Sequence, residues 1–159
     1  MQINKVRLIH KAFEKDPVHI ATYTPGLNDK GKDVHWILED IYKSSQNAMD
    51  SWSNPDITCY ENGFKYDGSR NFTMIAPLNK NPKLKDGPCK GKYMGHRSTS
   101  CGDLCQVVYK NKTDYYFCAA IGWKKITADQ YNKIITIKDE LELRDYFAKA
   151  NLGKENIDG

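Results

Sequence analysis

Four of the five cysteines lie in one stretch between Pro82 and Trp123. Four thiolates satisfy a tetrahedral zinc ion, and the spacing of Cys101 and Cys105 suits two ligands of one site. His96 lies nearby as a spare ligand. This pattern makes a structural zinc ion one hypothesis for the stretch, with the ligands Cys89, Cys101, Cys105 and Cys118.

Two other interpretations of these cysteines stay open. Free cysteine behaves as a small hydrophobic residue, so all four side chains could be ordinary buried thiols, which is the simplest interpretation. Alternatively, Cys105–Cys118 and Cys89–Cys101 could be disulfides. The second bridge would close a loop for which chain entropy predicts a stabilisation of roughly 3 kcal/mol. A cytosolic address disfavours disulfides.

The turn at Asn111-Lys112 bears on the same question. A two-residue turn pairs residue 110 with residue 113, and therefore places Cys105 opposite Cys118. That pair is of the non-hydrogen-bonded kind, whose Cα atoms lie roughly 4.5 Å apart. We therefore expect the two sulfurs to lie within bonding or shared-ligand distance. A three-residue loop would shift the register and break this pairing.

A dense basic segment precedes the hairpin. Residues 79–97 carry six lysines and arginines against one acidic residue, Asp86, in a chain whose net charge is +4. The charge excess is therefore local, as at a partner-binding surface. A long loop, 79–105, is expected here, and loops of this length are often functional. The predicted binding residues are Lys83, Lys85, Lys90, Lys92, Tyr93, His96 and Arg97.

This segment leads to two classes of function. The leading hypothesis is a non-enzymatic protein of the inhibitor or adaptor type, which binds a macromolecular partner, protein or nucleic acid, through the basic loop. It leads because no nucleotide-binding, zinc-protease or serine-hydrolase motif is present. The alternative is an enzyme that acts on nucleic acid or nucleotides, with the loop as a phosphate clamp. A further hypothesis is a nucleophilic dyad of Cys101 with His96.

Two short elements suggest a third class. Ser98-Thr99-Ser100 is followed forty residues later by Glu140-Leu141-Glu142. The pair is similar to the STS and ExE elements of ADP-ribosyltransferases. The resemblance covers six residues. It implies that the ExE element lies on a turn entering a strand and that Glu142 polarises the nicotinamide ribose of the substrate.

The elements that must position these residues predict a single α+β domain with a mainly antiparallel sheet. Strands are expected at 3–13, 17–24, 71–78 and in the hairpin 104–122, with a further hairpin around Asn62-Gly63. Apolar residues at helical spacing predict one central helix, 34–52, after an N-cap at Asp33. Two helices are expected near the C-terminus, the first beginning with a capping box at Thr127.

Composition supports a globular domain. The chain of 159 residues is 40% hydrophobic and 28% charged, which is typical of a folded soluble protein. The sequence contains no apolar run of the length needed to cross a membrane, so no membrane partner is expected. The first residues lack the apolar core of a signal peptide, which makes a cytoplasmic location the default expectation.

Overall fold

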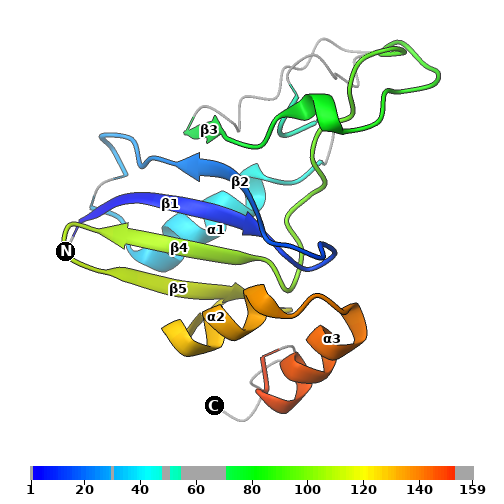
Figure 1. Cartoon of the computed structure of the whole chain (residues 1–159). Coiled ribbons are helices and arrows are strands. Elements are labelled where there is room, and N and C mark those ends of the chain that lie inside the picture. The colour runs from blue at the N-terminus through cyan, green and yellow to red at the C-terminus, as the bar shows by residue number, and fades with distance from the viewer. Residues whose placement is uncertain (1, 30, 48–50, 55–70, 153–159) are drawn as a thin grey trace.

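An antiparallel sheet forms the centre of the computed structural model, which describes residues 2–29, 31–47, 51–54 and 71–152. Among these residues, six strands run in the order β3-β2-β1-β4-β5-β6 (Figure 1). The predicted α+β single-domain fold is confirmed. The strands are β1 (Ile3–His10), β2 (Val18–Tyr23), β3 (Phe72–Met74), β4 (Leu104–Tyr109), β5 (Thr113–Cys118) and β6 (Trp123–Ile126).

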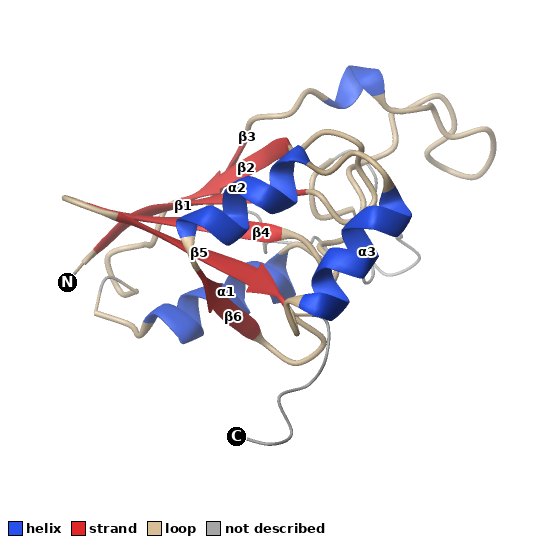
Figure 2. Ribbon diagram, turned by 60° about the horizontal axis from the view of Figure 1, so that its bottom comes forward, coloured by secondary structure: helices blue, strands red, loops and turns tan. Residues whose placement is uncertain are grey.

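Helices cover both faces of the sheet. Helix α1 (Val34–Ser44) lies on one face, and α2 (Ala128–Thr136) and α3 (Glu140–Lys149) lie on the other (Figure 2). Each face has its own apolar cluster because side chains along a strand alternate between the faces. Thus Cys105 packs in the cluster that includes α1, whereas Leu104 packs in the cluster that includes α2 and α3.

Helix α1 is shorter than the sequence predicts. Its start at Asp33 is confirmed, because the side chain of Asp33 accepts a hydrogen bond from the His35 N–H. The predicted end at residue 52 is wrong, since the helix ends at Ser44. There the Ser45 hydroxyl bonds the carbonyl of Ile41 at 2.7 Å. Such side-chain bonds to the backbone compete with the helical ladder and favour its termination.

The hairpin of β4 and β5 has a different register from the one predicted. Val108 pairs with Thr113, and Cys105 therefore lies opposite Tyr116 instead of Cys118. The turn has two residues, Lys110 and Asn111, one position earlier than predicted, and it is closed by a bond from the Tyr109 N–H to the Lys112 carbonyl. A shift of two residues keeps every side chain on its face. Cys105 and Cys118 thus share one apolar cluster, as diagonal neighbours.

The C-terminal helices begin at side-chain caps. The capping box predicted at Thr127 is confirmed, with Gln130 as its second member. In α3 the cap is Asp139, whose carboxylate accepts from the Glu142 N–H.

The sequence also predicted a second hairpin and the absence of a membrane-spanning segment. The hairpin predicted around Asn62-Gly63 lies outside the described residues. No helix in the described part of the chain is long and apolar enough to cross a membrane.

Candidate functional site

Residues 81–94, here called the lobe, project from the end of the sheet that carries β3 (Figure 1). They follow a short 3-10 helix, η1 (Leu78–Lys80). An antiparallel bridge joins Lys83 to Tyr93, and the Leu84 N–H donates to the Lys92 carbonyl at 2.9 Å. Two glycines, Gly87 and Gly91, adopt positive φ at the bends. The lobe is therefore a folded excursion held by its own backbone bonds.

The structure divides the predicted binding residues into two groups. Five lie on the lobe and are exposed: Lys83, Lys85, Lys90, Lys92 and Tyr93. The other two, His96 and Arg97, lie in the segment 95–100, here called the stem, where the chain returns to the sheet. Their side chains turn inward and bind other parts of the protein.

His96 fixes the start of the stem. Its Nε2 atom lies 3.0 Å from the Ala76 carbonyl oxygen, and its Nδ1 atom lies 3.3 Å from the side-chain amide of Asn81. Its backbone N–H donates to the Ser53 hydroxyl at 2.6 Å. Both ring nitrogens are thus engaged, while the Cys101 thiol donates elsewhere. The predicted dyad of His96 with Cys101 is not formed.

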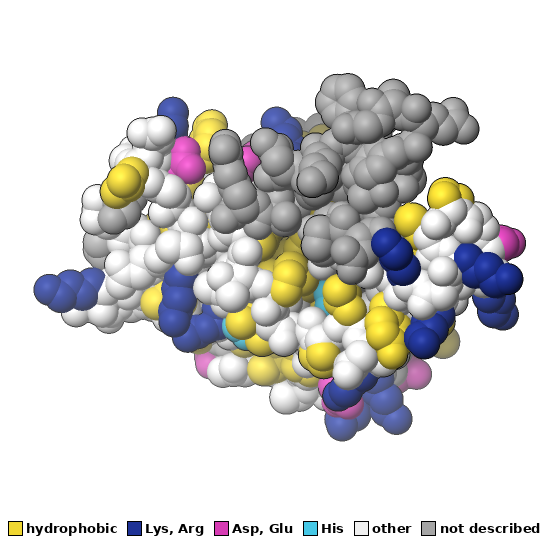
Figure 3. Space-filling model, turned by 90° about the horizontal axis from the view of Figure 1, so that it is seen from above, with side chains coloured by type: hydrophobic (Ala, Val, Ile, Leu, Met, Phe, Trp, Pro, Cys, Tyr) yellow, Lys and Arg dark blue, Asp and Glu magenta, His cyan; other side chains and the backbone are white. Residues whose placement is uncertain are grey.

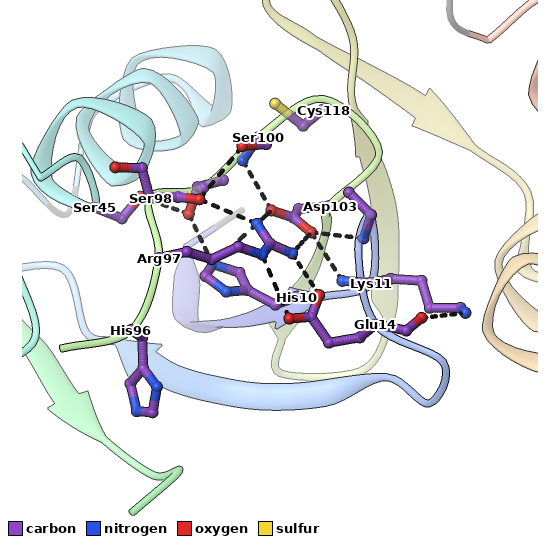
Figure 4. A network of polar contacts seen from close by, with 12 residues as sticks. His10, Lys11, Glu14, Ser45, His96, Arg97, Ser98, Ser100, Asp103 and Cys118 are labelled. Carbon is purple, nitrogen blue, oxygen red and sulfur yellow. Dashed lines mark hydrogen bonds and ion pairs between the residues drawn. The ribbon is translucent and has the colours of Figure 1, made fainter. Parts of the chain in front are cut away.

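Arg97 lies between two carboxylates. Its guanidinium donates to Glu14 at 2.6 Å and to Asp103 at 2.7 and 2.8 Å (Figure 4). Burial lowers the pKa of Arg97, but the hydrogen bonds to Asp103 and Glu14 outweigh it and raise that pKa overall. A guanidinium held in this bidentate way is not free to grip a phosphate.

Asp103 is fully buried and carries the densest set of bonds in the site. Besides Arg97, the backbone N–H groups of Lys11, Ala12 and Ser100 donate to its carboxylate at 2.8 to 3.0 Å. Burial raises the pKa of Asp103, yet the bonds from Arg97 and the nearby His10 hold it below its usual range. This carboxylate therefore joins the loop after β1 to the stem.

His10, Thr99 and Ser45 form the interior end of the same network. The His10 Nε2 atom lies 3.1 Å from the Thr99 hydroxyl oxygen, to which the Ser45 hydroxyl donates at 2.7 Å. Burial lowers the pKa of His10 to about 4, so the ring is neutral at pH 7. These residues and the two ion pairs are called the anchor network below: His10, Glu14, Ser45, Arg97, Thr99 and Asp103.

The chain after α1 adds a second set of bonds to the stem. The Trp52 indole N–H donates to the Arg97 carbonyl at 2.9 Å. The side-chain amides of Asn47 and Asn54 donate to the carbonyls of His96 and Tyr93, at 3.0 and 2.7 Å. These partners were not predicted from the sequence. Their signal is a run of short polar residues directly after the helix, a composition that favours backbone capping.

No protein-family model, curated protein or solved structure matches this chain. The assignment of the site therefore depends on its geometry. Among the described residues, no buried side-chain nitrogen or oxygen lacks a hydrogen-bond partner. The anchor network is thus satisfied internally, and it attaches the stem of the lobe to β1, the loop after it and the end of α1.

The geometry gives the ADP-ribosyltransferase resemblance no support. Glu140 and Glu142 lie in the first turn of α3 and are exposed, whereas the resemblance implies a turn that enters a strand. Thr99, the middle residue of the serine–threonine element, is buried and bonded to His10 and Ser45.

Cys101, Cys105 and Cys118 are free thiols. Cys105 and Cys118 are buried in the sheet, Cys89 lies on the lobe, and Cys101 is exposed next to the stem. Nowhere in the described ranges do three or more histidine, cysteine or acidic side chains form a group that could hold a metal ion. The predicted zinc ligands Cys89, Cys101, Cys105 and Cys118 therefore do not form one such group in the described part of the chain.

Proposed function

We propose that this chain is a non-enzymatic binding protein of the inhibitor or adaptor type, which holds an acidic protein partner against the lobe. One observation carries the proposal: the exposed lysines of the lobe surround exposed apolar side chains. Tyr93 is 36% and Met94 is 42% exposed. At the right of Figure 3, the side chains of lysine and arginine gather around hydrophobic ones on this part of the surface.

Charge and polarity together favour a protein partner. Protein interfaces are enriched in aromatic residues and methionine at their centre and have a polar rim. The lobe has both kinds of side chain exposed: Met94 and Tyr93, with Lys83 against the Tyr93 ring, and Lys85 and Lys90 on the same lobe. An acidic partner would be steered to it by the lysines, which raise the association rate more than the affinity.

Two features make nucleic acid the weaker candidate. Recognition of phosphates and base edges favours arginine, and the arginine predicted for this role, Arg97, is bound to Glu14 and Asp103. In addition, the ammonium of Lys83 lies 5.1 Å from the centre of the Tyr93 ring. That face of the ring is thus covered by a cation and is not presented to a base.

The test is a comparison of three labelled probes by fluorescence anisotropy at several salt concentrations. The first is a peptide alternating glutamate with leucine, the second alternates glutamate with serine, and the third is a single-stranded oligonucleotide of the same charge. We expect the glutamate–leucine peptide to bind most tightly and its affinity to fall with salt, because ion pairs at a surface are screened. Tightest binding of the oligonucleotide would assign the lobe to nucleic acid instead.

Matched variants locate the binding. Replacing Lys83, Lys85 and Lys90 by glutamine should weaken peptide binding by about tenfold, or about 1.4 kcal/mol. The control replaces Lys43, Lys110 and Lys133, which are also exposed and lie outside the lobe, and leaves the same net charge. Equal weakening by both triple variants would show a nonspecific charge effect and reject the lobe as the binding site. Met94→Ala should weaken binding of the leucine peptide more than that of the serine peptide.

A further inference from the structure

Cys101 and Cys118 converge on one carbonyl group at the end of β5. The Cys101 sulfur donates to the Ala119 carbonyl oxygen at 3.3 Å, and the Cys118 sulfur lies 3.9 Å from the same oxygen. Burial raises the pKa of Cys118, and the neighbouring Cys101 thiol adds to that rise. Because both sulfurs lie within 4 Å of one oxygen, a modest side-chain movement can bring them to the short separation of a disulfide.

The backbone around Cys101 is held firmly in this position. Residues 100–103 form a tight turn, in which the Asp103 N–H donates to the Ser100 carbonyl at 3.0 Å. Gly102 has φ of +98°, which is the left-handed conformation expected at the third position of a type II turn. A side chain there would also lie 3.1 Å from Cβ of Ala12. The turn therefore depends on this glycine.

Backbone bonds attach the turn to β5 at Cys118 itself. The Gly102 N–H donates to the Cys118 carbonyl at 2.8 Å, and the Cys118 N–H donates to the Asp103 carbonyl at 2.9 Å. A bond between the two sulfurs thus requires little movement of the backbone. By contrast, Cys105 and Cys118 are diagonal neighbours on β4 and β5. Such pairs lie about 7–8 Å apart, beyond the usual span of a disulfide.

The two thiols differ in access to solvent. Cys101 is exposed, whereas Cys118 is 2% exposed. Cys118 lines a hollow of about 140 Å³ together with Glu39, Tyr42 and Trp123. Burial raises the pKa of Cys118 above its ordinary value, and a protonated thiol is a poor nucleophile toward an oxidant. Cys101 is thus the thiol that a solution oxidant meets first.

We infer that Cys101 and Cys118 form a redox-active dithiol, which hydroperoxides oxidise to an intramolecular disulfide. In the first step the Cys101 thiolate attacks the outer oxygen of the hydroperoxide. The O–O bond breaks, Cys101 becomes a sulfenic acid, and an alkoxide or hydroxide leaves. The Cys118 thiol then attacks the Cys101 sulfur, the S–O bond breaks, and water leaves. Two electrons pass from the thiols to the peroxide, and a dithiol reductant reverses the change.

The experiment treats the reduced protein with hydrogen peroxide, blocks remaining thiols in denaturant and maps the peptides by mass spectrometry. Cleavage after lysine and arginine, combined with cleavage before aspartate, separates the three thiols of this region onto the fragments 98–102, 103–110 and 114–124. We expect 98–102 joined to 114–124, with a mass loss of about two hydrogens. The monomer should persist on a non-reducing gel.

Three variants test the order of the steps. In Cys101→Ser, Cys118 should stay reduced at the peroxide dose that oxidises the wild type. In Cys118→Ala, Cys101 should stop at a sulfenic acid that dimedone labels, and Cys89→Ser should form the bridge as the wild type does. The inference is overturned if either cysteine joins Cys105, Cys89 or Cys59, or a second molecule. It is also overturned if Cys101 of the wild type passes to sulfinic acid while Cys118 remains a thiol.

Discussion

The Nε2 atom of His10 lies 3.1 Å from the hydroxyl oxygen of Thr99, a residue 89 positions later in the chain. This contact joins the end of β1 to the stem of the lobe. Because the Ser45 hydroxyl donates to the same oxygen at 2.7 Å, the end of α1 meets them there. Burial lowers the pKa of His10 and so keeps the ring neutral, although the Asp103 carboxylate, which bonds other groups, lies beside it (Figure 4).

The first prediction concerns pH. Burial lowers the pKa of His10 from 6.5 to about 4; Asp103 and Glu14 oppose this shift, whereas Arg97 and His96 add to it. Between these pH values the unfolded chain binds a proton that the folded protein does not. Acidification therefore favours unfolding, by about 1.4 kcal/mol per pH unit from roughly pH 6.5 to 4. Urea unfolding measured at half-unit steps of pH tests this slope.

Two variants identify the group responsible. His10→Gln keeps a side chain that can bond Thr99 and cannot be protonated, so it should flatten the slope in this window. His19→Gln is the second variant, because burial also lowers the pKa of His19. It should remove only the part of the pH dependence that His19 contributes. Asp103 acts separately. Its depressed pKa means that its stabilisation is lost only as the pH falls below the ordinary aspartate range. An unchanged slope in His10→Gln contradicts the prediction.

The second prediction concerns Asp103. Asp103→Ala leaves the Arg97 guanidinium without its bidentate partner and three backbone N–H groups without an acceptor. Breaking a buried pair in this way typically costs 3–5 kcal/mol. The matched control is Asp145→Ala, which removes an exposed pair with Lys149 and should cost below about 1 kcal/mol. Chemical denaturation measures both. Similar losses would show that the anchor network contributes no more than a surface pair.

Local patterns in the sequence predicted the parts of the fold that neighbours in sequence determine. The caps at Asp33 and Thr127 depend on side chains within three residues of the bonded N–H. The buried stripe of Leu38 and Ile41 follows from helical spacing. A charge count also located the exposed lysines of the lobe correctly, since a run of lysines has little opportunity for burial.

The internal role of His96 and Arg97 could not be predicted in this way. The acceptors of Arg97 include Glu14, which lies 83 residues away in sequence, and those of His96 include Ala76. Composition assigns such residues to the basic loop, although their side chains bind other parts of the protein and so attach the stem to the sheet. The hairpin register was missed because the two-residue turn lies at Lys110-Asn111, one residue before the predicted position, and a turn displaced by one residue changes the pairing by two.

The third prediction concerns the packing of α1. Leu38 lies on the buried side of α1 and is 0% exposed. Leu38→Ala should therefore lower the free energy of unfolding by roughly 2–5 kcal/mol. The matched control is the same substitution at Leu141, which is 77% exposed on α3 and should change stability by at most about 0.5 kcal/mol. Thermal and urea unfolding of the two variants give the comparison. A loss at Leu38 as small as that at Leu141 would contradict the packing of α1 on the sheet.

The fourth prediction concerns Gly95, the first residue of the stem. A Cβ atom there would lie 1.9 Å from the Ser51 hydroxyl oxygen and 2.8 Å from that of Ser53, which accepts the His96 N–H. Gly95→Ala should therefore cost about 1–3 kcal/mol, as overpacking does. It should also speed amide exchange at Met94, whose N–H bonds the Pro82 carbonyl at the base of the lobe. Denaturant unfolding and hydrogen exchange measure the two effects.

Two further substitutions to alanine serve as the control and as the test of the steric clash at residue 95. Gly31→Ala places its Cβ in open space and should leave stability within about 0.5 kcal/mol of the wild type. Ser51→Ala removes the oxygen nearest to the new methyl group, at the loss of its bond from the Asn54 N–H. The double variant of Gly95→Ala with Ser51→Ala should therefore be more stable than the sum of the single changes predicts, by at least about 0.5 kcal/mol. Strict additivity would show that Ser51 does not restrict residue 95 and that the stem tolerates a side chain there.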